Sequence, residues 1–187
     1  AYLNNANNED DIKNGTELAK LYRILIHGVK FRHSVANYSC DKDGIYKGIA
    51  SIKFLNEEAA NDLYSIKDEK FEVFIDLLER ISSLKIDSRQ LDILIKLDFF
   101  EEFGNIQYLL TCNNLFNKYY GKTQIKKDKA LEAGLDFDLL RECCQKETAK
   151  TFTKVNSRKL LSLLINNIPN ETTPLKQKIT YQIECLG

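Results

Sequence analysis

Two segments decide the fold of this chain: KGIASIKFLNEEAA (residues 47–60) and SRQLDILIKLDFFEEFG (residues 88–104). Each predicts two short helices joined by a tight turn, because apolar residues at helical spacing are interrupted by only a few residues. We expect the turns at Ile52–Glu57 and Leu97–Phe99. Between the segments, apolar residues over 71–81 predict a longer amphipathic helix. This layout is typical of two helix-hairpin-helix elements in tandem.

A helix-hairpin-helix holds DNA without reading its bases. The turn presents backbone N–H groups, and the N-terminus of the following helix adds a partial positive charge that favours a phosphate oxygen. Lys53 is the nearest cation to the first turn, and Lys96 is the nearest to the second. The candidate DNA contacts at the two turns are Ser51, Lys53, Phe54, Leu55, Asn56, Lys96, Asp98 and Phe99. For an isolated turn, the alternative is an ordinary packing corner between two helices.

The segment before the first hairpin predicts one helix and one β-hairpin. The helix is expected to begin at Thr16, after a frayed polar stretch over 4–13, and to end at Gly28. The residues that follow, up to Ser34, have no regular pattern. Over 35–49 the period changes to two around an Asp-Gly turn, which predicts two antiparallel strands. It is the strong β signal of the sequence.

The segment after the second hairpin predicts helices only. They are expected over 105–120, 137–146, 157–168 and 174–186. A lysine cluster between Lys118 and Lys129 either follows a phosphate backbone or forms a solvated linker. Its candidate DNA contacts are Lys122, Lys126 and Lys127. The predicted fold class is mainly α: a tandem helix-hairpin-helix (51–120) with a small N-terminal β-hairpin (within 1–50) and a C-terminal helical extension (121–187).

The composition limits the function classes. Lys and Arg number 27, as do Asp and Glu, so the formal net charge is zero. This argues against a surface that binds polyanions throughout, and it leaves a local basic patch open. No apolar run is long enough to cross a membrane. Five cysteines without framework spacing indicate the reducing cytoplasm. The absence of methionine indicates a processed product or an excised piece of a longer protein.

No catalytic, metal or cofactor site is expected from the motifs. The sequence lacks a Cys-x-x-Cys pair and a phosphate-binding glycine loop, and its acidic residues have no spacing suited to two metal ions. His27 and His33 with Cys40, or the adjacent Cys143 and Cys144, are weak metal candidates. A Cys–His nucleophile pair, which requires a thiol with a lowered pKa, is left as an alternative.

Several short motifs occur in one order along the chain. They are Gly48-Ile49-x-x-Ile52-Lys53, Phe71-x-x-Phe74-x-Asp76-Leu77, Arg89-Gln90-Leu91-x-x-Leu94-Ile95-Lys96 and Phe99-Phe100. As a set, they resemble the bacterial DNA polymerase III alpha subunit, the C-family replicative polymerase, in a divergent or phage-like form. Residues 34–49 are similar to the hairpin that ends the fingers region of that family. Residues 183–187 are similar to the segment that precedes its oligonucleotide-binding domain.

The resemblance implies a piece of a nucleotidyltransferase that works in DNA replication, from the end of the fingers through the tandem helix-hairpin-helix region. In that family the region holds the backbone of double-stranded DNA, and the catalytic aspartates lie upstream. The implied partners are duplex DNA and the remaining polymerase domains, without catalysis in this piece. Where the family has turn glycines, this sequence has Phe54, Asn56 and Asp98. The alternative is therefore a degenerate scaffold that connects polymerase domains without touching DNA.

Overall fold

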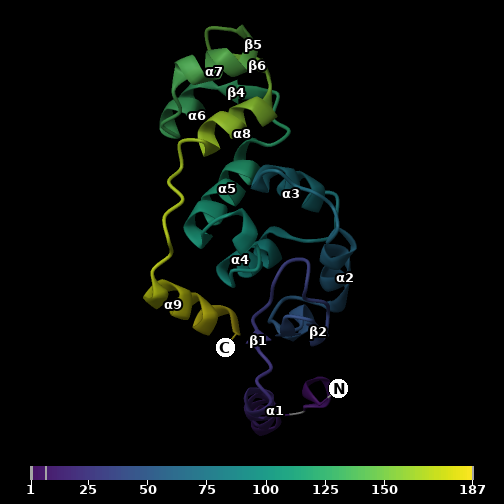
Figure 1. The fold of residues 1–187 in the computed structure, drawn as a ribbon. Helices are drawn as coiled ribbons and strands as arrows, with labels where there is room; N and C mark the ends of the chain where they lie inside the picture. Colours follow the sequence, from purple (N-terminus) through teal and green to yellow (C-terminus); the bar gives the residue numbers. More distant parts are fainter. Residues whose placement is uncertain (1, 7, 187) are drawn as a thin grey trace. The chain divides into compact units, whose positions relative to one another are not determined.

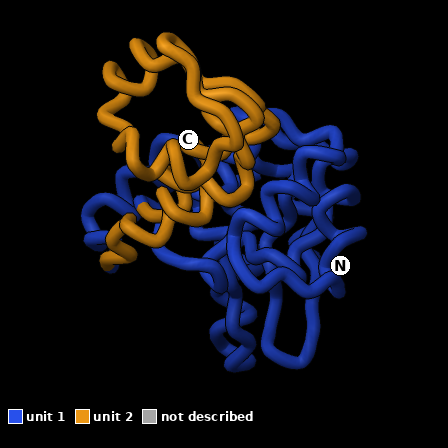
Figure 2. Tube along the Cα trace, turned by 90° about the horizontal axis from the view of Figure 1, so that it is seen from above, with its two compact units in different colours: residues 1–107, 172–187 blue, residues 108–171 orange. Residues whose placement is uncertain are grey.

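The computed structural model describes residues 2–6 and 8–186 and forms two compact units (Figure 2). Unit 1 comprises residues 1–107 and 172–187, and unit 2 comprises residues 108–171. The mainly α fold predicted from the sequence is confirmed, with two small three-stranded sheets (Figure 1). The functional division expected near residues 50 and 120 remains a prediction. Gly187, the last residue of the polymerase-like C-terminal segment, lies outside the described residues.

Unit 1 begins with a short 3-10 helix, η1 (Leu3–Asn5), and with helix α1 (Glu9–Leu21). The prediction that this helix begins at Thr16 is wrong. The Asn8 side chain caps it by accepting a hydrogen bond from the backbone N–H of Asp11 at 2.8 Å. Three acidic residues follow in the first turn, where the helix dipole favours negative charge. The helix therefore begins in the stretch that we expected to be frayed.

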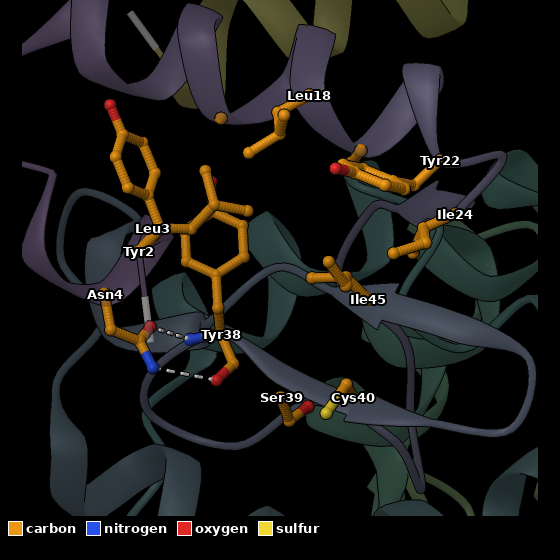
Figure 3. A pocket seen from close by; sticks show the side chains of 12 residues that line it. Tyr2, Leu3, Asn4, Leu18, Tyr22, Ile24, Tyr38, Ser39, Cys40 and Ile45 are labelled. Atoms are coloured by element: carbon orange, nitrogen blue, oxygen red, sulfur yellow. Dashed lines mark hydrogen bonds between the residues drawn. The ribbon is translucent and has the colours of Figure 1, made fainter.

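Asn4 ties the N-terminal segment to the β-hairpin region (residues 35–49). Its side-chain amide lies against the backbone of Tyr38 (Figure 3). Asn4 Oδ1 accepts from the Tyr38 N–H at 2.8 Å, and Asn4 Nδ2 donates to the Tyr38 carbonyl at 3.1 Å. Gly15 of α1 lets η1 approach, because a Cβ there would lie 2.6 Å from Leu3 Cδ2. A mostly apolar cavity of about 310 Å³ remains between η1, α1 and the hairpin.

The predicted β-hairpin is confirmed, and a third strand joins it. The first sheet has the order β1-β3-β2, with β1 (Ile26–His27), β2 (Ser39–Asp41) and β3 (Gly44–Tyr46). Strands β2 and β3 are antiparallel, and β1 runs parallel to β3 with Ile26 opposite Ile45. Gly44 has φ 143°, and a Cβ there would meet the Leu25 carbonyl oxygen at 2.4 Å. Only glycine therefore lets β1 approach the turn. Strand β1 is too short to leave a pattern in the sequence.

The two hairpins follow this sheet in the predicted order. The elements are η2 (Ile49–Ser51), α2 (Glu57–Ser65), α3 (Phe74–Ile81), α4 (Ser88–Lys96) and η3 (Glu101–Phe103). Asn56 caps α2, since its Oδ1 accepts from the Ala59 N–H at 2.8 Å. A capping box begins α4. Asp87 caps that helix, and the Gln90 side chain accepts in return from the Asp87 N–H.

An aromatic cluster forms the centre of unit 1. The Phe100 ring lies 5.6 Å from Phe31, 5.7 Å from Phe74 and 4.8 Å from Phe99, centroid to centroid. These four side chains are almost fully buried, and tilted ring pairs at such distances are favourable. The Phe31 N–H also donates to the Phe99 carbonyl at 2.9 Å. The cluster therefore joins the segment before the first hairpin to the turn of the second.

Unit 2 follows helix α5 (Ile106–Tyr119), whose first two residues belong to unit 1. Its other elements are β4 (Gln124–Lys126), α6 (Lys127–Glu132), α7 (Phe137–Cys143), β5 (Cys144–Glu147), β6 (Thr151–Val155) and α8 (Ser157–Ile165). The three strands form an antiparallel sheet in the order β4-β6-β5. The linker prediction for the lysine cluster is therefore wrong, and the predicted helical extension contains a sheet. Helix α9 (Leu175–Leu186) belongs to unit 1 and contacts α4.

The cap of α2 gives a test of this local structure. Asn56→Ala removes the acceptor for the Ala59 N–H, and we expect it to lower the free energy of unfolding by about 1 kcal/mol. Asn56→Ser keeps an acceptor at the same place and should recover most of the loss. Urea unfolding followed by circular dichroism measures both. Equal stabilities of the alanine and serine variants would contradict the cap.

Candidate nucleic-acid interface

The turn of the first hairpin reverses the chain through Phe54. Its φ is 71°, in the left-handed region that glycine adopts readily and other residues seldom do. Phe54 stands in a backbone conformation that glycine would permit more readily. A left-handed conformation costs a non-glycine residue roughly 1–2 kcal/mol. Contacts from another element must therefore hold the turn.

Helix α4 supplies these contacts. Gln90 Nε2 donates to the Phe54 carbonyl at 3.0 Å, and the Gln90 side chain is buried. The guanidinium carbon of Arg89 lies 3.4 Å from the centroid of the Phe54 ring, and Lys53 Nζ lies 5.2 Å from it. Phe54 is 46% exposed. The hairpin tip therefore presents an aromatic ring between two cations, which attract its π electrons.

The first turn also leaves backbone donors open. Within the described part of the chain, the Lys53 and Phe54 N–H groups have no backbone acceptor in the turn. Helix α2 begins three residues later, and its first N–H groups, those of Glu57 and Glu58, have no acceptor within the helix. Glu58 is paired with Lys85 at 2.6 Å, which offsets one of the two carboxylates near these donors. Open N–H groups, Lys53 and Arg89 therefore all occur at or beside this turn.

The second hairpin has the same backbone conformation and different surroundings. Asp98 has φ 64°, which an aspartate tolerates better than most residues. The three turn N–H groups all donate to carbonyls of α4, Leu97 to Ile93, Asp98 to Ile95 and Phe99 to Leu94, each at 3.0 Å. They are not available to a phosphate. This turn closes the C-terminus of α4 by itself.

Helix α9 covers the charged side chains of this second turn. Lys178 Nζ contacts Asp98 Oδ2, and Glu184 Oε2 lies 3.7 Å from Lys96 Nζ. The Lys96 ammonium also lies 5.5 Å from the ring centroid of Tyr181. Lys96 and Asp98 are therefore both engaged with α9. A helix 75 or more residues further along the sequence supplies these partners, so the hairpin pattern alone gave no sign of them.

The remaining candidate DNA contacts at the two hairpins are buried in the core or hydrogen-bonded within the fold. Leu55 and Phe99 are buried in the core of unit 1. The Ser51 hydroxyl donates to the Gly48 carbonyl at 2.9 Å, and the Asn56 side chain caps α2. The structure thus brings Lys53 and Phe54 together at the exposed tip and adds Arg89, which sequence reasoning missed. A signal for Arg89 existed, because it precedes the Gln90 of the capping box.

The lysine candidates of unit 2 fall into two groups. Lys122 and Lys126 are exposed, and within the described residues neither has an acidic partner. Lys127 instead pairs with Glu147, and its ammonium lies 5.3 Å from the Phe152 ring centroid. Arg141 Nε donates to the same carboxylate at 3.0 Å. Lys127 therefore holds α6 against the sheet, while Lys122 and Lys126 are available to a ligand.

Three cysteines have pKa values shifted away from what thiol chemistry needs. Burial raises the pKa of Cys112 to about 11, and it also raises the pKa values of Cys143 and Cys185. A nucleophilic thiol needs a shift in the opposite direction. His27 and His33 stack on the two sides of Tyr46, with centroid distances of 4.7 and 4.5 Å. Over the described residues, no group of three or more His, Cys, Asp and Glu side chains could hold a metal ion.

The geometry agrees with the comparison with protein families. The family model of the helix-hairpin-helix motif matches residues 23–107, which include both hairpins. The chain therefore contains a helix-hairpin-helix region, and such motifs generally bind DNA without sequence specificity. A search of curated proteins found no match. Among the helices described, none has the length and apolar character needed to cross a membrane.

Substitutions at Phe54 separate the strain of the turn from the contacts of the ring. Both Phe54→Gly and Phe54→Ala remove the ring, but only glycine relieves the left-handed conformation. We expect the glycine variant to be more stable than the alanine variant by about 1 kcal/mol in urea unfolding. At Lys53, whose φ is not positive, the same pair should have the opposite order by about 0.4–1 kcal/mol. The same order at both positions would contradict the strained turn.

Glu147 gives a pH test of the role assigned to Lys127. Hydrogen bonds from Arg141 and Lys127 lower the pKa of Glu147 to about 2. A lowered folded-state pKa means that the charged form stabilises the fold above the ordinary pKa of about 4.5, and that this contribution is lost as the pH falls towards 2. Wild type should therefore be more stable than Glu147→Gln at pH 6, with the difference shrinking between pH 4.5 and 2. A difference in the free energy of unfolding between the two proteins that does not change with pH would contradict this role.

Proposed function

We propose that this chain binds the backbone of double-stranded DNA without reading its sequence, with the first hairpin as the contact. The observation that carries the proposal is the exposed tip at Lys53 and Phe54. There, open N–H groups lie beside the N-terminus of α2, and Arg89 adds a second cation. Donors of these kinds position a protein on phosphates and carry no information about bases.

The second hairpin has a different role in this proposal. Its turn N–H groups are satisfied within the chain, and its cation is engaged with α9. It packs through Phe99 into the aromatic cluster and orients α4, which carries Arg89 and Gln90 to the first turn. The tandem pair is thus a binding element and a supporting element.

The finer proposal is that the chain is a piece of a bacterial DNA polymerase III alpha subunit, working in replication in the cytoplasm. The support is the order of sequence motifs from Gly48 to Phe100 and the helix-hairpin-helix match over residues 23–107. In this proposal the piece binds duplex DNA next to the other polymerase domains and performs no nucleotidyl transfer. It needs no cofactor of its own.

A scaffold function is the second candidate, and one observation favours it. The partners of Lys96 and Asp98 on α9 close the second hairpin, and both turns carry a bulkier residue where glycine would let DNA approach closely. If the first hairpin is also inactive, the pair connects neighbouring parts of a larger protein without a DNA contact. The two candidates differ in whether duplex DNA binds at Lys53.

Fluorescence anisotropy with labelled duplexes of two unrelated sequences tests the choice. We expect both duplexes to bind equally and the affinity to fall steeply with salt. Lys53→Ala and Arg89→Ala should each weaken binding to both duplexes and reduce the salt slope by about 0.9 per lost phosphate contact. Lys96→Ala should have little effect, because α9 engages this ammonium.

Lys13→Ala is the matched control, since Lys13 is an exposed lysine on α1 and lies outside both hairpins. If both the Lys53 and the Arg89 variant bind DNA with wild-type affinity, the proposed contact of the first hairpin with DNA is wrong. In that case, restoring glycine at Phe54 and Asn56 distinguishes the scaffold. Duplex binding through the hairpin that appears only in the glycine variant would show that the native hairpins serve packing alone.

A further inference from the structure

The charges of the chain are segregated between its two units. Unit 2 contains eleven Lys and Arg residues and seven Asp and Glu residues, a formal net charge of +4. Unit 1 contains sixteen and twenty, a formal net charge of −4. The zero net charge of the whole chain therefore conceals a basic unit and an acidic unit. A polyanion such as DNA is attracted to the first and repelled by the second.

The acidic side chains of unit 2 are largely engaged with a few basic ones. Glu147 pairs with Lys127 and Arg141, Glu132 with Lys129, and Glu142 with Lys159. Asp138 also pairs with Arg141. Asp128 and Asp136 accept hydrogen bonds from nearby backbone N–H groups. Little negative charge is left to compensate the other lysines.

Six exposed lysines of unit 2 have no acidic partner within the described residues. They are Lys118, Lys122, Lys126, Lys146, Lys150 and Lys154. All except Lys118 lie on or beside the β4-β6-β5 sheet. Unpaired lysines repel one another, so a surface of this kind is stabilised by an anionic ligand.

The sheet register brings polar groups from all three strands together. Gln124 of β4 and Lys146 of β5 both lie opposite Thr153 of β6. Lys126 lies opposite Thr151, one outward-facing row further along. Between these rows, Ile125 and Phe152 face the core of the unit. The face exposed to solvent therefore carries lysine, threonine and glutamine side chains.

Two hollows adjoin the sheet, and both are lined by residues of these outward rows. One, of about 480 Å³, is lined by Lys118, Lys122, Gln124, Lys126 and Lys129, with Glu132 at Lys129. The other, of about 630 Å³, is lined by Gln124, Lys146, Thr153 and Lys154, among others. Gln124 lines both hollows, and we name the polar residues that line the two hollows the lysine face.

We propose that the lysine face is a second binding surface for the backbone of duplex DNA, separate from the first hairpin. This inference rests on the proposed function, because it assumes that the chain binds DNA. Ammonium, hydroxyl and amide groups are the side chains that contact phosphate and sugar. Tyr119 is the one aromatic residue among those that line the two hollows, and it is buried. The hollows therefore offer no exposed ring on which a base could stack. Single strands need such stacking, whereas duplex backbone does not.

The lysine face also supplies what the first hairpin lacks. Lys53 and Arg89 belong to the acidic unit, so their attraction for DNA acts against its net charge of −4. Each phosphate neutralised on the lysine face releases counterions and adds to the salt dependence. We therefore assign most of the salt dependence of binding to unit 2, and the precise positioning of a phosphate to the hairpin.

A triple substitution in the full chain tests this surface. We expect Lys122→Gln, Lys126→Gln and Lys146→Gln together to weaken duplex binding at least about tenfold at low salt, and to reduce the salt slope by roughly 2.7. The matched control replaces three exposed lysines of unit 1, Lys13, Lys20 and Lys42, by Gln. It makes the same change in net charge and should alter affinity much less. Circular dichroism checks that both variants are folded.

Acetylation footprinting gives a second measurement that does not depend on a variant. Duplex DNA should protect Lys122, Lys126 and Lys146 from acetylation and leave Lys13 reactive. Equal effects of the two triple variants, or no protection, would overturn the lysine face. Protection by single-stranded DNA alone would overturn its assignment to duplex.

The outcomes also separate this inference from the hairpin contact. If Lys53→Ala and Arg89→Ala bind normally and the unit 2 triple variant does not, the lysine face stands and the hairpin contact fails. The reverse pattern removes the lysine face alone. A wild-type chain that binds no duplex at low salt rejects both.

Discussion

The two left-handed turns constrain everything around them. Phe54 and Asp98 stand in a conformation that glycine adopts without cost and other residues adopt at roughly 1–2 kcal/mol. Such strain persists only where surrounding contacts over-determine the backbone. Gln90 holds the carbonyl of Phe54, and the hydrogen bonds of Leu97, Asp98 and Phe99 close the other turn. These contacts therefore help to hold the chain reversal at each turn.

The same contacts decide which turn remains accessible. The first turn is held from α4, which brings the Arg89 guanidinium to the exposed ring of Phe54 and leaves nearby N–H groups open. The second turn is held by its own backbone and is covered by α9, whose Lys178 neutralises Asp98. An aspartate at a phosphate-binding turn would repel its ligand, whereas an aspartate that pairs with a lysine contributes to packing. A non-glycine residue thus has opposite consequences at two turns that both have positive φ.

Local signals in the sequence predicted the local structure well. The Asp-Gly hairpin and the order of the two helix-hairpin-helix turns each depend on a few neighbouring residues. Contacts between distant segments leave no such signal in the sequence. The contacts of α9 with Lys96 could therefore not be predicted. The strands of unit 2 were missed because only Ile125, Phe152 and Val155 are buried in them, so their alternation is too short to distinguish from a linker. The Asn8 cap is a local signal for the early start of α1, but the polar residues around it are equally typical of a frayed terminus.

Composition alone concealed the distribution of charge. A net charge of zero is a sum over residues, and it says nothing about which acids are already paired with which bases. In unit 2, Glu147 contacts both Lys127 and Arg141, so its carboxylate is not available to the outer lysines, which are left uncompensated. The lysine cluster therefore divides into Lys127, which stabilises the unit, and Lys122 and Lys126, which face solvent. Positioning by N–H groups acts over a few ångströms, whereas attraction by unpaired lysines extends over about a Debye length. In the proposed binding mode, the long-range attraction of the lysine face brings DNA to a hairpin that lies in an acidic unit.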